Sequence, residues 1–268
     1  MAPRRPLPVL LERGVQGGRT GVRSTETGLG VAHAVIASSH LKLCGTAGYE
    51  GVIVATHDQC AGELVNEFLD DVVALTRAVD AIGGFDSADE VIITAGGSAF
   101  FDHVIDRFSL LEMDRQVRIV IRSGCYLTHS EGQLDNVSPM GAAPRTGRAE
   151  ERLLPAVEVW GAVLSRPEPT RAIVGIGKRD ASPDGVLPTA KRIRRRGEDT
   201  VRKIKPIVAT AMNDQHAYLD LDPHDPLAVG DLVGFGISHP CTTFDKWRVI
   251  PLVDDDYHVK EPLIHTYF

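Results

Sequence analysis

The first half of the chain alternates short apolar runs with amphipathic stretches, and glycine-rich turns separate them. The longest amphipathic stretch covers 58–82, where apolar side chains recur at intervals of three and four residues before Gly83-Gly84. Strand, glycine-rich turn, helix and strand is the order of a parallel βα array. The expected strands cover 7–11, 41–44, 91–93 and 117–121, and two shorter helices are expected at 29–37 and near 101–108.

About four βα units are visible in this half, and four units are too few to close an eight-stranded barrel. The pattern alone fits either an open sheet or a barrel whose beginning the chain does not contain. From Leu153 onward the residue pattern changes. Strand-like runs follow one another and are separated by turns rich in proline, glycine and aspartate. This half predicts an antiparallel β domain, with expected strands at 157–164, 170–175, 204–210, 217–221 and 232–235.

The boundary between the two halves is expected in the polar segment 141–151, which gives domains at 1–145 and 146–268. A basic run at 191–205 is interpreted as a solvated turn between strands. The 268 residues include 43% apolar and 24% charged residues, as in a soluble globular protein. The net charge of −7 argues against nucleic acid as the main partner.

No apolar run approaches the ~20 residues that span a bilayer, and the first residues do not read as a signal peptide. The four cysteines are scattered without the spacing of a disulfide framework. In a chain of this size they are expected to be reduced thiols in a cytoplasmic protein.

His239, Pro240 and Cys241 form the most informative short motif. Residues two apart in an extended strand point to the same side, and a proline pushes the residue before it towards extended conformations. An imidazole and a thiol would then lie side by side as ligands for a soft divalent metal such as zinc. The alternative is an ordinary buried strand end, since this spacing alone is not specific.

Several further motifs accompany this pair in a fixed order. With these motifs the chain resembles the D-serine dehydratase and D-threonine aldolase family of pyridoxal-phosphate (PLP) enzymes, in particular the amino acid deaminase branch. The resemblance implies an alanine-racemase-like fold, with a PLP-binding βα barrel followed by a β domain. The motifs are Gly17-Gly18-Arg19-Thr20-Gly21-Val22, Gly45-Thr46-Ala47-Gly48-Tyr49-Glu50-Gly51, Arg122-Ser123-Gly124-Cys125-Tyr126, Gly175-Ile176-Gly177-Lys178-Arg179-Asp180 and Asn213-Asp214-Gln215-His216.

The resemblance implies roles for two residues that follow the first strands. Arg19 would lie near the phenolic oxygen of PLP, where a fixed cation favours the charged form. Tyr49, flanked by glycines, would pack against the pyridine ring or donate a hydrogen bond to the cofactor. The alternatives are a surface arginine in a βα loop and a half-buried aromatic residue in a turn.

Two turns of small residues at strand ends are candidates for the phosphate group, because backbone N–H groups there can hold a dianion. One turn runs from Thr94 to Ser98. In the other, the resemblance implies that Gly124 and Cys125 bind phosphate through main-chain groups and that Arg122 approaches the pyridine nitrogen. Ordinary βα turns are the alternative.

His216 resembles a histidine of the family's β domain that faces the active site, and it is the candidate catalytic residue. A solvated loop histidine is the alternative. Family members bind PLP through a lysine in a Pro-His-x-Lys-Thr-like stretch, which this sequence does not contain. Lys178 matches a β-domain motif instead, so the role is not transferred to it. The expectation is a truncated gene product or a misplaced start, and the chain's own activity is left open.

The implied function is that of a PLP- and metal-dependent lyase of D-β-hydroxy amino acids such as D-serine or D-threonine, giving a 2-oxo acid and ammonia. Cysteine as the second metal ligand resembles the dehydratase branch rather than the aldolases. The alternatives are a D-threonine aldolase and a non-catalytic fragment that binds a metal or a small anion. Related enzymes pair two subunits, so a homodimer is a further expectation.

Overall fold

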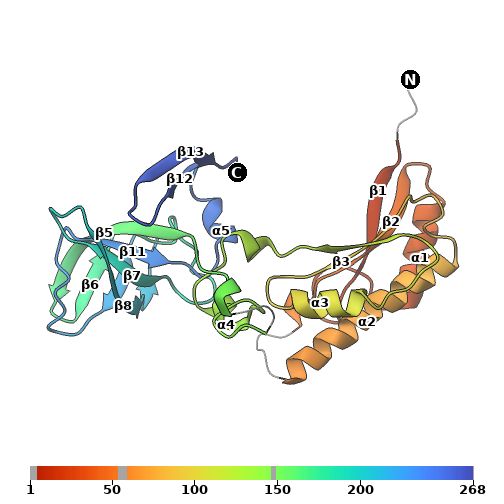
Figure 1. Cartoon of the computed structure of the whole chain (residues 1–268), viewed down its shortest axis with the longest axis horizontal. Helices are drawn as coiled ribbons and strands as arrows, with labels where there is room; N and C mark the ends of the chain where they lie inside the picture. The colour runs from red at the N-terminus through yellow and green to blue at the C-terminus, as the bar shows by residue number, and fades with distance from the viewer. Residues whose placement is uncertain (1–4, 54–58, 146–148, 268) are drawn as a thin grey trace. The chain divides into compact units, whose positions relative to one another are not determined.

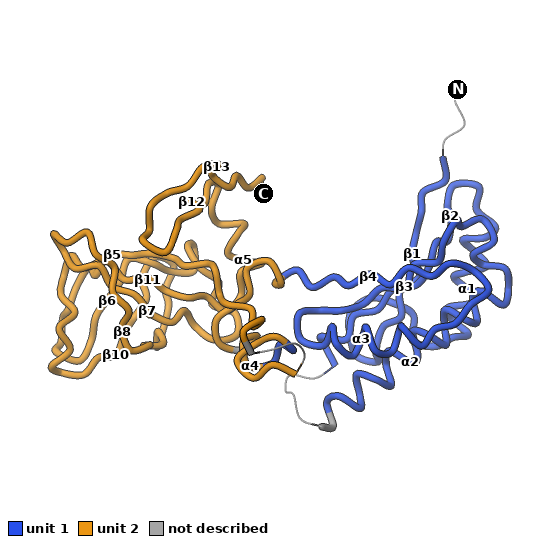
Figure 2. Tube along the Cα trace, viewed as in Figure 1, with its two compact units in different colours: residues 1–124, 137–139 blue, residues 125–136, 140–268 orange. Residues whose placement is uncertain are grey.

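The computed structural model describes residues 5–53, 59–145 and 149–267. The chain divides into two compact units (Figure 2). The first unit comprises residues 1–124 and 137–139, and the second comprises 125–136 and 140–268. Each unit has its own hydrophobic core.

The first unit is built on a parallel sheet whose four strands lie side by side in the order of the sequence (Figure 1). The strands are β1 (Leu7–Arg13), β2 (Leu41–Gly48), β3 (Val91–Ala95) and β4 (Val117–Ile121). A doubly wound sheet reverses its strand order at a switch point, whereas successive barrel strands do not. The unbroken order therefore fits part of a barrel wall, as predicted.

Helices connect successive strands and pack on this sheet (Figure 1). They are α1 (Thr25–Ile36), α2 (Gln59–Ala81) and α3 (Phe101–Phe108). The apolar stripe predicted for α2 forms much of the core, since Val65, Leu69, Val72, Leu75 and Val79 are fully buried. Helix α1 begins at Ser24, whose side chain accepts a hydrogen bond from the Thr27 N–H at 3.1 Å and so caps the helix.

The second unit contains an antiparallel sheet with the strand order β8-β7-β11-β5-β6-β10-β9. A separate hairpin pairs β12 with β13. The chain also contains two short α-helices, α4 (Gln133–Val137) and α5 (Cys241–Phe244). The strands are β5 (Glu158–Glu168), β6 (Arg171–Val174), β7 (Thr189–Arg194), β8 (Val201–Val208), β9 (Ala211–Met212), β10 (Ala217–Asp220), β11 (Leu232–Gly236), β12 (Val249–Val253) and β13 (Val259–His265).

Alternating side chains of this sheet form the second core. Val233 and Phe235 on β11 are fully buried, as are Val174 on β6 and Leu219 on β10. The predicted antiparallel β domain is thus confirmed. Together the two units show the predicted architecture, a partial parallel βα barrel of alanine-racemase type and a C-terminal β domain.

The interpretation of the whole basic run at 191–205 as a turn was wrong, because only 195–200 connect two strands. Residues 191–194 belong to β7, which lies inside the sheet between β11 and β8, and residues 201–205 belong to β8. Ala190 and Ile193 are buried, while Lys191 Nζ forms an ion pair with Glu131 Oε2 at 2.8 Å. Long basic side chains can line a strand when their aliphatic stems pack and their charges find partners.

Candidate functional site

In the first unit, the predicted cofactor residues gather at the carboxyl ends of the parallel strands. The Arg19 guanidinium carbon lies 5.0 Å from the centre of the Tyr49 ring, a cation–π contact. Arg122 follows β4, and its Nε donates to the Thr94 hydroxyl at 3.1 Å, while its Nη2 donates to the Gly48 carbonyl. This edge of a parallel sheet is where ligands bind in βα folds.

A buried carboxylate at this edge was not predicted from the sequence. Glu50 is fully buried and follows Tyr49 directly. Its two oxygen atoms accept hydrogen bonds from the Gly96 and Gly97 N–H groups at 3.0 and 2.6 Å. These are two of the amides considered for the phosphate group, and in this structure the chain's own carboxylate binds them. The Gly-Tyr-Glu-Gly sequence carried the only local signal.

Gly97 also explains how Tyr49 is placed. A Cβ atom at Gly97 would lie 2.9 Å from Tyr49 Cε2, so the ring packs directly on the backbone. No side chain fits there without displacing the ring.

In the second predicted phosphate turn, the Gly124 N–H donates to the Arg122 carbonyl at 3.0 Å, and the Ser123 hydroxyl donates to the Gly97 carbonyl at 3.1 Å.

The predicted metal pair lies in the second unit, directly after β11. His239 Nδ1 is 3.2 Å from Asp184 Oδ2. When this nitrogen carries the hydrogen and donates it to the carboxylate, Nε2 keeps its lone pair, as in carboxylate–histidine–metal arrangements. The His239 side chain is 40% exposed, and Cys241 is exposed.

The backbone between the two residues differs from the expected extended path. Pro240 has helical dihedral angles, φ −62° and ψ −31°, and Cys241 is the first residue of α5. The prediction that both side chains share one face of a strand therefore does not apply here. Within the described residues, no group of three or more His, Cys, Asp or Glu side chains is arranged to hold a metal ion. Zinc at His239 and Cys241 stays a prediction.

Cys125 lies beside the predicted metal ligand. Its Sγ is 3.5 Å from Cys241 Sγ, although the two residues are 116 positions apart in the chain. The resemblance assigned Cys125 a main-chain role at the phosphate, and no signal in the sequence pointed to its side chain. Cys125 belongs to a 3₁₀ turn, Gly124–Leu127, and both cysteines are in the second unit.

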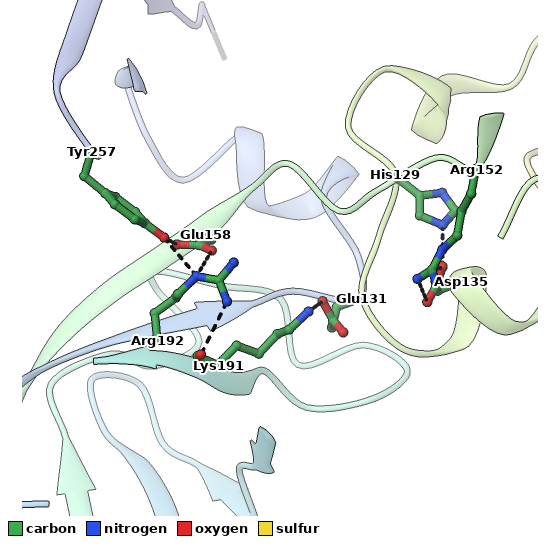
Figure 3. A network of polar contacts seen from close by, with 8 residues as sticks. All are labelled: His129, Glu131, Asp135, Arg152, Glu158, Lys191, Arg192 and Tyr257. Atoms are coloured by element: carbon green, nitrogen blue, oxygen red, sulfur yellow. Dashed lines mark hydrogen bonds and ion pairs between the residues drawn. The ribbon is translucent and has the colours of Figure 1, made fainter. Parts of the chain in front are cut away.

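Backbone and ionic contacts fix the segment that follows Cys125 to the β domain. The Glu131 N–H donates to the Ile237 carbonyl at 2.8 Å, and the Ala156 N–H donates to the Thr128 carbonyl at 2.9 Å. Figure 3 shows the Glu131 carboxylate next to the Lys191 ammonium, 2.8 Å away. The position of Cys125 beside Cys241 thus does not depend on any contact between their sulfur atoms.

A second polar cluster supports the same segment. His129 is 2% exposed, and its Nε2 lies 3.2 Å from Asp135 Oδ1. Arg152 reaches the same carboxylate at 3.0 Å (Figure 3). His129 and Asp135 lie in the predicted first domain and Arg152 lies just after the predicted boundary segment, and none of the three was predicted as a functional residue. They stabilise the turn that presents Cys125.

A third polar cluster joins the β12–β13 turn to the sheet (Figure 3). The Tyr257 hydroxyl donates to Glu158 Oε2 at 2.8 Å and accepts from Arg192 Nε at 3.2 Å. Burial, with the Glu158 carboxylate as a second cause, raises the pKa of Tyr257. Beside this cluster, Trp160 and Trp247 help line a mainly apolar pocket of about 270 Å³.

His216 and Lys178 lie in neighbouring turns of the second unit, and both side chains are exposed. The Lys178 N–H donates to the Asn213 carbonyl at 2.9 Å, and the Asn213 N–H donates to the His216 carbonyl at 2.8 Å. These bonds order the backbone and leave the catalytic role of His216 a prediction.

None of the helices in the described part of the chain has the length and apolarity that spanning a bilayer requires.

Comparison with solved structures finds proteins with a similar fold, among them the three that follow. A D-threonine aldolase from Filomicrobium marinum has a TM-score of 0.68 and 19% identity, over 96% of this chain and 61% of its own. A D-threo-3-hydroxyaspartate dehydratase from Delftia sp. HT23 has a TM-score of 0.66 and 18% identity, over 97% and 66%. An alanine racemase-like protein from Idiomarina loihiensis has a TM-score of 0.66 and 15% identity, over 96% and 64%.

The chain thus spans about three fifths to two thirds of the length of these proteins, and the likeness shows the fold. The similar structures also include two variants of D-threo-3-hydroxyaspartate dehydratase. One has a histidine changed to alanine, and the other, in a metal-free form, has a cysteine two positions later changed to alanine.

Sequence comparison identifies the second unit more closely. A search of curated protein sequences found no match. Residues 156–253, however, match the family described as "Putative serine dehydratase domain". The matched range includes Asp184, His239 and Cys241. This match to the second unit, together with the likeness of the fold to these solved structures, supports the resemblance to the D-serine dehydratase and D-threonine aldolase family.

Proposed function

We propose that this chain forms part of a PLP- and metal-dependent lyase that converts a D-β-hydroxy amino acid, such as D-serine or D-threonine, into a 2-oxo acid and ammonia. One observation carries the proposal. The serine dehydratase match covers the His239-Pro240-Cys241 segment, and there the structure places a carboxylate, Asp184, against His239 Nδ1. A carboxylate that accepts the Nδ1 hydrogen of a histidine is a common feature of metal sites, because it leaves Nε2 as the ligand.

The donor set of the second unit fits a zinc ion. His239 Nε2 and Cys241 Sγ would supply the nitrogen and sulfur ligands, which zinc accepts readily. The bound metal would supply a Lewis acid for the β-hydroxyl group of the substrate. The metal-free cysteine variant of a similar dehydratase supports this assignment, because the changed histidine and cysteine there have the same spacing.

Asp184 is proposed to hold the His239 ring in place. Its carboxylate accepts the Nδ1 hydrogen, which fixes the tautomer and the orientation of the ring. Both side chains are on the surface of the unit, His239 40% and Asp184 60% exposed, so solvent and substrate can reach them. Open ligand positions of this kind distinguish catalytic metal sites from closed structural ones.

The donor set of the first unit fits an anionic aromatic cofactor. Arg19, Tyr49 and Arg122 place two guanidinium groups and an aromatic ring at the carboxyl ends of the strands. PLP supplies an electron sink for the substrate's Cα when it is bound. The ring of Tyr49 would face the pyridine ring, and Arg19 would favour a negative charge on the phenolic oxygen.

The phosphate group is proposed to bind the turn at 122–125 rather than the turn after β3. In the turn after β3, Glu50 already accepts hydrogen bonds from the Gly96 and Gly97 N–H groups, and a second anion would be repelled there.

We further propose His216 as an acid–base group, a homodimer as the assembly and the cytoplasm as the location.

The products formed from D-threonine test the proposal directly. Purified full-length protein, supplied with PLP and zinc, is expected to release 2-oxobutyrate and ammonia in equal amounts, and L-threonine is expected to give neither. Glycine with acetaldehyde would instead show the aldolase, which the similar D-threonine aldolase makes the second candidate. Chromatography of the derivatised products separates the two outcomes.

A further inference from the structure

We infer that Cys125 and Cys241 form a reversible disulfide bond, and that this bond and a metal ion at Cys241 exclude each other. The first half of the inference stands on the structure of the second unit alone. The second half rests on the proposed function, because it requires the Cys241 thiolate as a ligand.

The two sulfur atoms are in direct non-bonded contact. They are 3.5 Å apart, and a disulfide bond is about 2.05 Å long, so closure requires an approach of about 1.5 Å. Both residues lie at short elements rather than inside long ones. Cys125 is in the 3₁₀ turn Gly124–Leu127 and Cys241 opens the four-residue helix α5. Closure would require a change in side-chain rotamer, with any backbone adjustment confined to these two short elements.

Contacts on both sides hold the sulfur atoms together. The Cys125 side is fixed by the hydrogen bonds of Thr128 and Glu131 to the β domain. The Cys241 side is fixed by Thr243, whose hydroxyl donates to the His239 carbonyl at 3.1 Å and lies 3.3 Å from the Ser182 nitrogen. The folded unit therefore supplies a high effective concentration of one thiol at the other.

Exposure makes this pair reachable by reagents in solution. Cys241 is exposed and Cys125 is half-buried. Thiol reactivity follows access as well as thiolate character. Cys44 offers the contrast, because it lies on β2 of the first unit and its Sγ is 3.6 Å from the Lys42 carbonyl of its own strand.

The bond forms by thiol–disulfide exchange with a small disulfide such as oxidised glutathione. The Cys241 thiolate attacks one glutathione sulfur and releases one glutathione thiolate. The Cys125 thiolate then attacks Cys241 Sγ and releases the second. The two protein thiols lose two electrons and two protons, and one glutathione disulfide becomes two glutathione thiols. A dithiol reductant reverses both steps.

Disulfide formation removes the thiolate that a metal requires. A sulfur atom shared in a disulfide carries no negative charge and is a poor ligand for zinc. Zinc bound to the Cys241 thiolate would in turn block its attack on a disulfide. The oxidised chain is therefore a metal-free form, and reduction restores the ligand.

Alkylation and mass spectrometry of the metal-free, full-length protein test the first half. After equilibration with oxidised glutathione, the protein is expected to lose two alkylatable thiols and two hydrogen atoms, and peptide mapping links Cys125 to Cys241. Cys44→Ser, the matched control, behaves like the wild type. Cys125→Ser and Cys241→Ser form no internal bond and carry at most one glutathione at the remaining cysteine of the pair. Separate glutathione adducts on both cysteines of the wild type would overturn the inference.

Zinc content after loading tests the second half. The reduced wild type and reduced Cys125→Ser are expected to bind one zinc ion each, whereas the oxidised wild type binds none until a dithiol is added. Zinc retained by the oxidised protein would overturn the exclusion. A linked disulfide without zinc binding in the reduced protein would uphold the bond and refute the proposed metal site.

Discussion

Replacing His239 by alanine and Cys241 by serine together is expected to abolish zinc binding by the reduced protein. The double variant removes both proposed protein ligands, and water alone does not hold zinc at this surface. Asp184→Asn keeps both ligands but weakens acceptance of the Nδ1 hydrogen of His239, and it is expected to lower zinc affinity by about 10-fold to 100-fold. Competition with a chromophoric chelator measures the affinities.

His258→Ala is the matched control for this experiment. His258 also lies beside a carboxylate, with its Nδ1 3.6 Å from Asp254 Oδ1, and its side chain is 76% exposed. It has no place in the proposed site, so its loss leaves zinc affinity unchanged. Equal zinc content in the wild type and the double variant would contradict the assignment of His239 and Cys241.

Asp231→Ala is expected to lower the free energy of unfolding by about 3 kcal/mol. The change breaks a nearly buried ion pair and leaves several hydrogen-bond donors without their acceptor. The side chain is 4% exposed, and its Oδ2 lies 2.6 Å from Arg195 Nη1. The N–H groups of Arg196 and Ala228 each donate to the carboxylate at 2.9 Å. One carboxylate thus joins the end of β7 to the turn before β11.

The Asp231 contribution also depends on pH. Burial alone would raise the pKa of Asp231, but hydrogen bonds from the Arg196 and Ala228 N–H groups and from Arg195 outweigh it and hold the pKa below 3.8. A carboxyl group whose pKa is lowered by folding stabilises the native state above its unfolded pKa. We expect the difference between the wild type and Asp231→Ala to be complete at neutral pH and to shrink as the pH falls below 3.8.

Urea unfolding followed by circular dichroism at pH 7 and at pH 3 measures both effects. Asp199→Ala is the control, since Asp199 is exposed in the connection between β7 and β8, and surface changes of this kind cost less than about 0.5 kcal/mol. A difference between the wild type and Asp231→Ala that persists undiminished at pH 3 would show that the charge of Asp231 is not its source.

The sequence predicts elements well where periodicity and turn residues agree. Strand β4 has the expected bounds, and α2 agrees within one residue at each end, because its apolar stripe recurs regularly and Gly83-Gly84 follows it. Strand β7 was missed because its lysine and arginines resemble a solvated turn. Their partners, Glu131 and Glu158, come from distant parts of the chain.

The candidate sites show the same limit. Residues placed by strand ends, such as Arg19 and Tyr49, could be expected together, since carboxyl ends of parallel strands share one edge. Glu50 could not, because its role depends on amides 46 and 47 positions away. Cys125 and Cys241 meet only through the path of the backbone in the second unit. Long-range side-chain contacts of this kind leave no periodic trace in a sequence.

The coordination of zinc in the reduced protein tests most directly whether His239 and Cys241 bind a single ion. X-ray absorption at the zinc edge measures the distances and types of the first ligands. The expected shell contains one sulfur atom at about 2.3 Å and at least one nitrogen atom at about 2.0–2.1 Å, and the sulfur is lost in Cys241→Ser. A shell of oxygen and nitrogen atoms without sulfur in the wild type would contradict the proposed site.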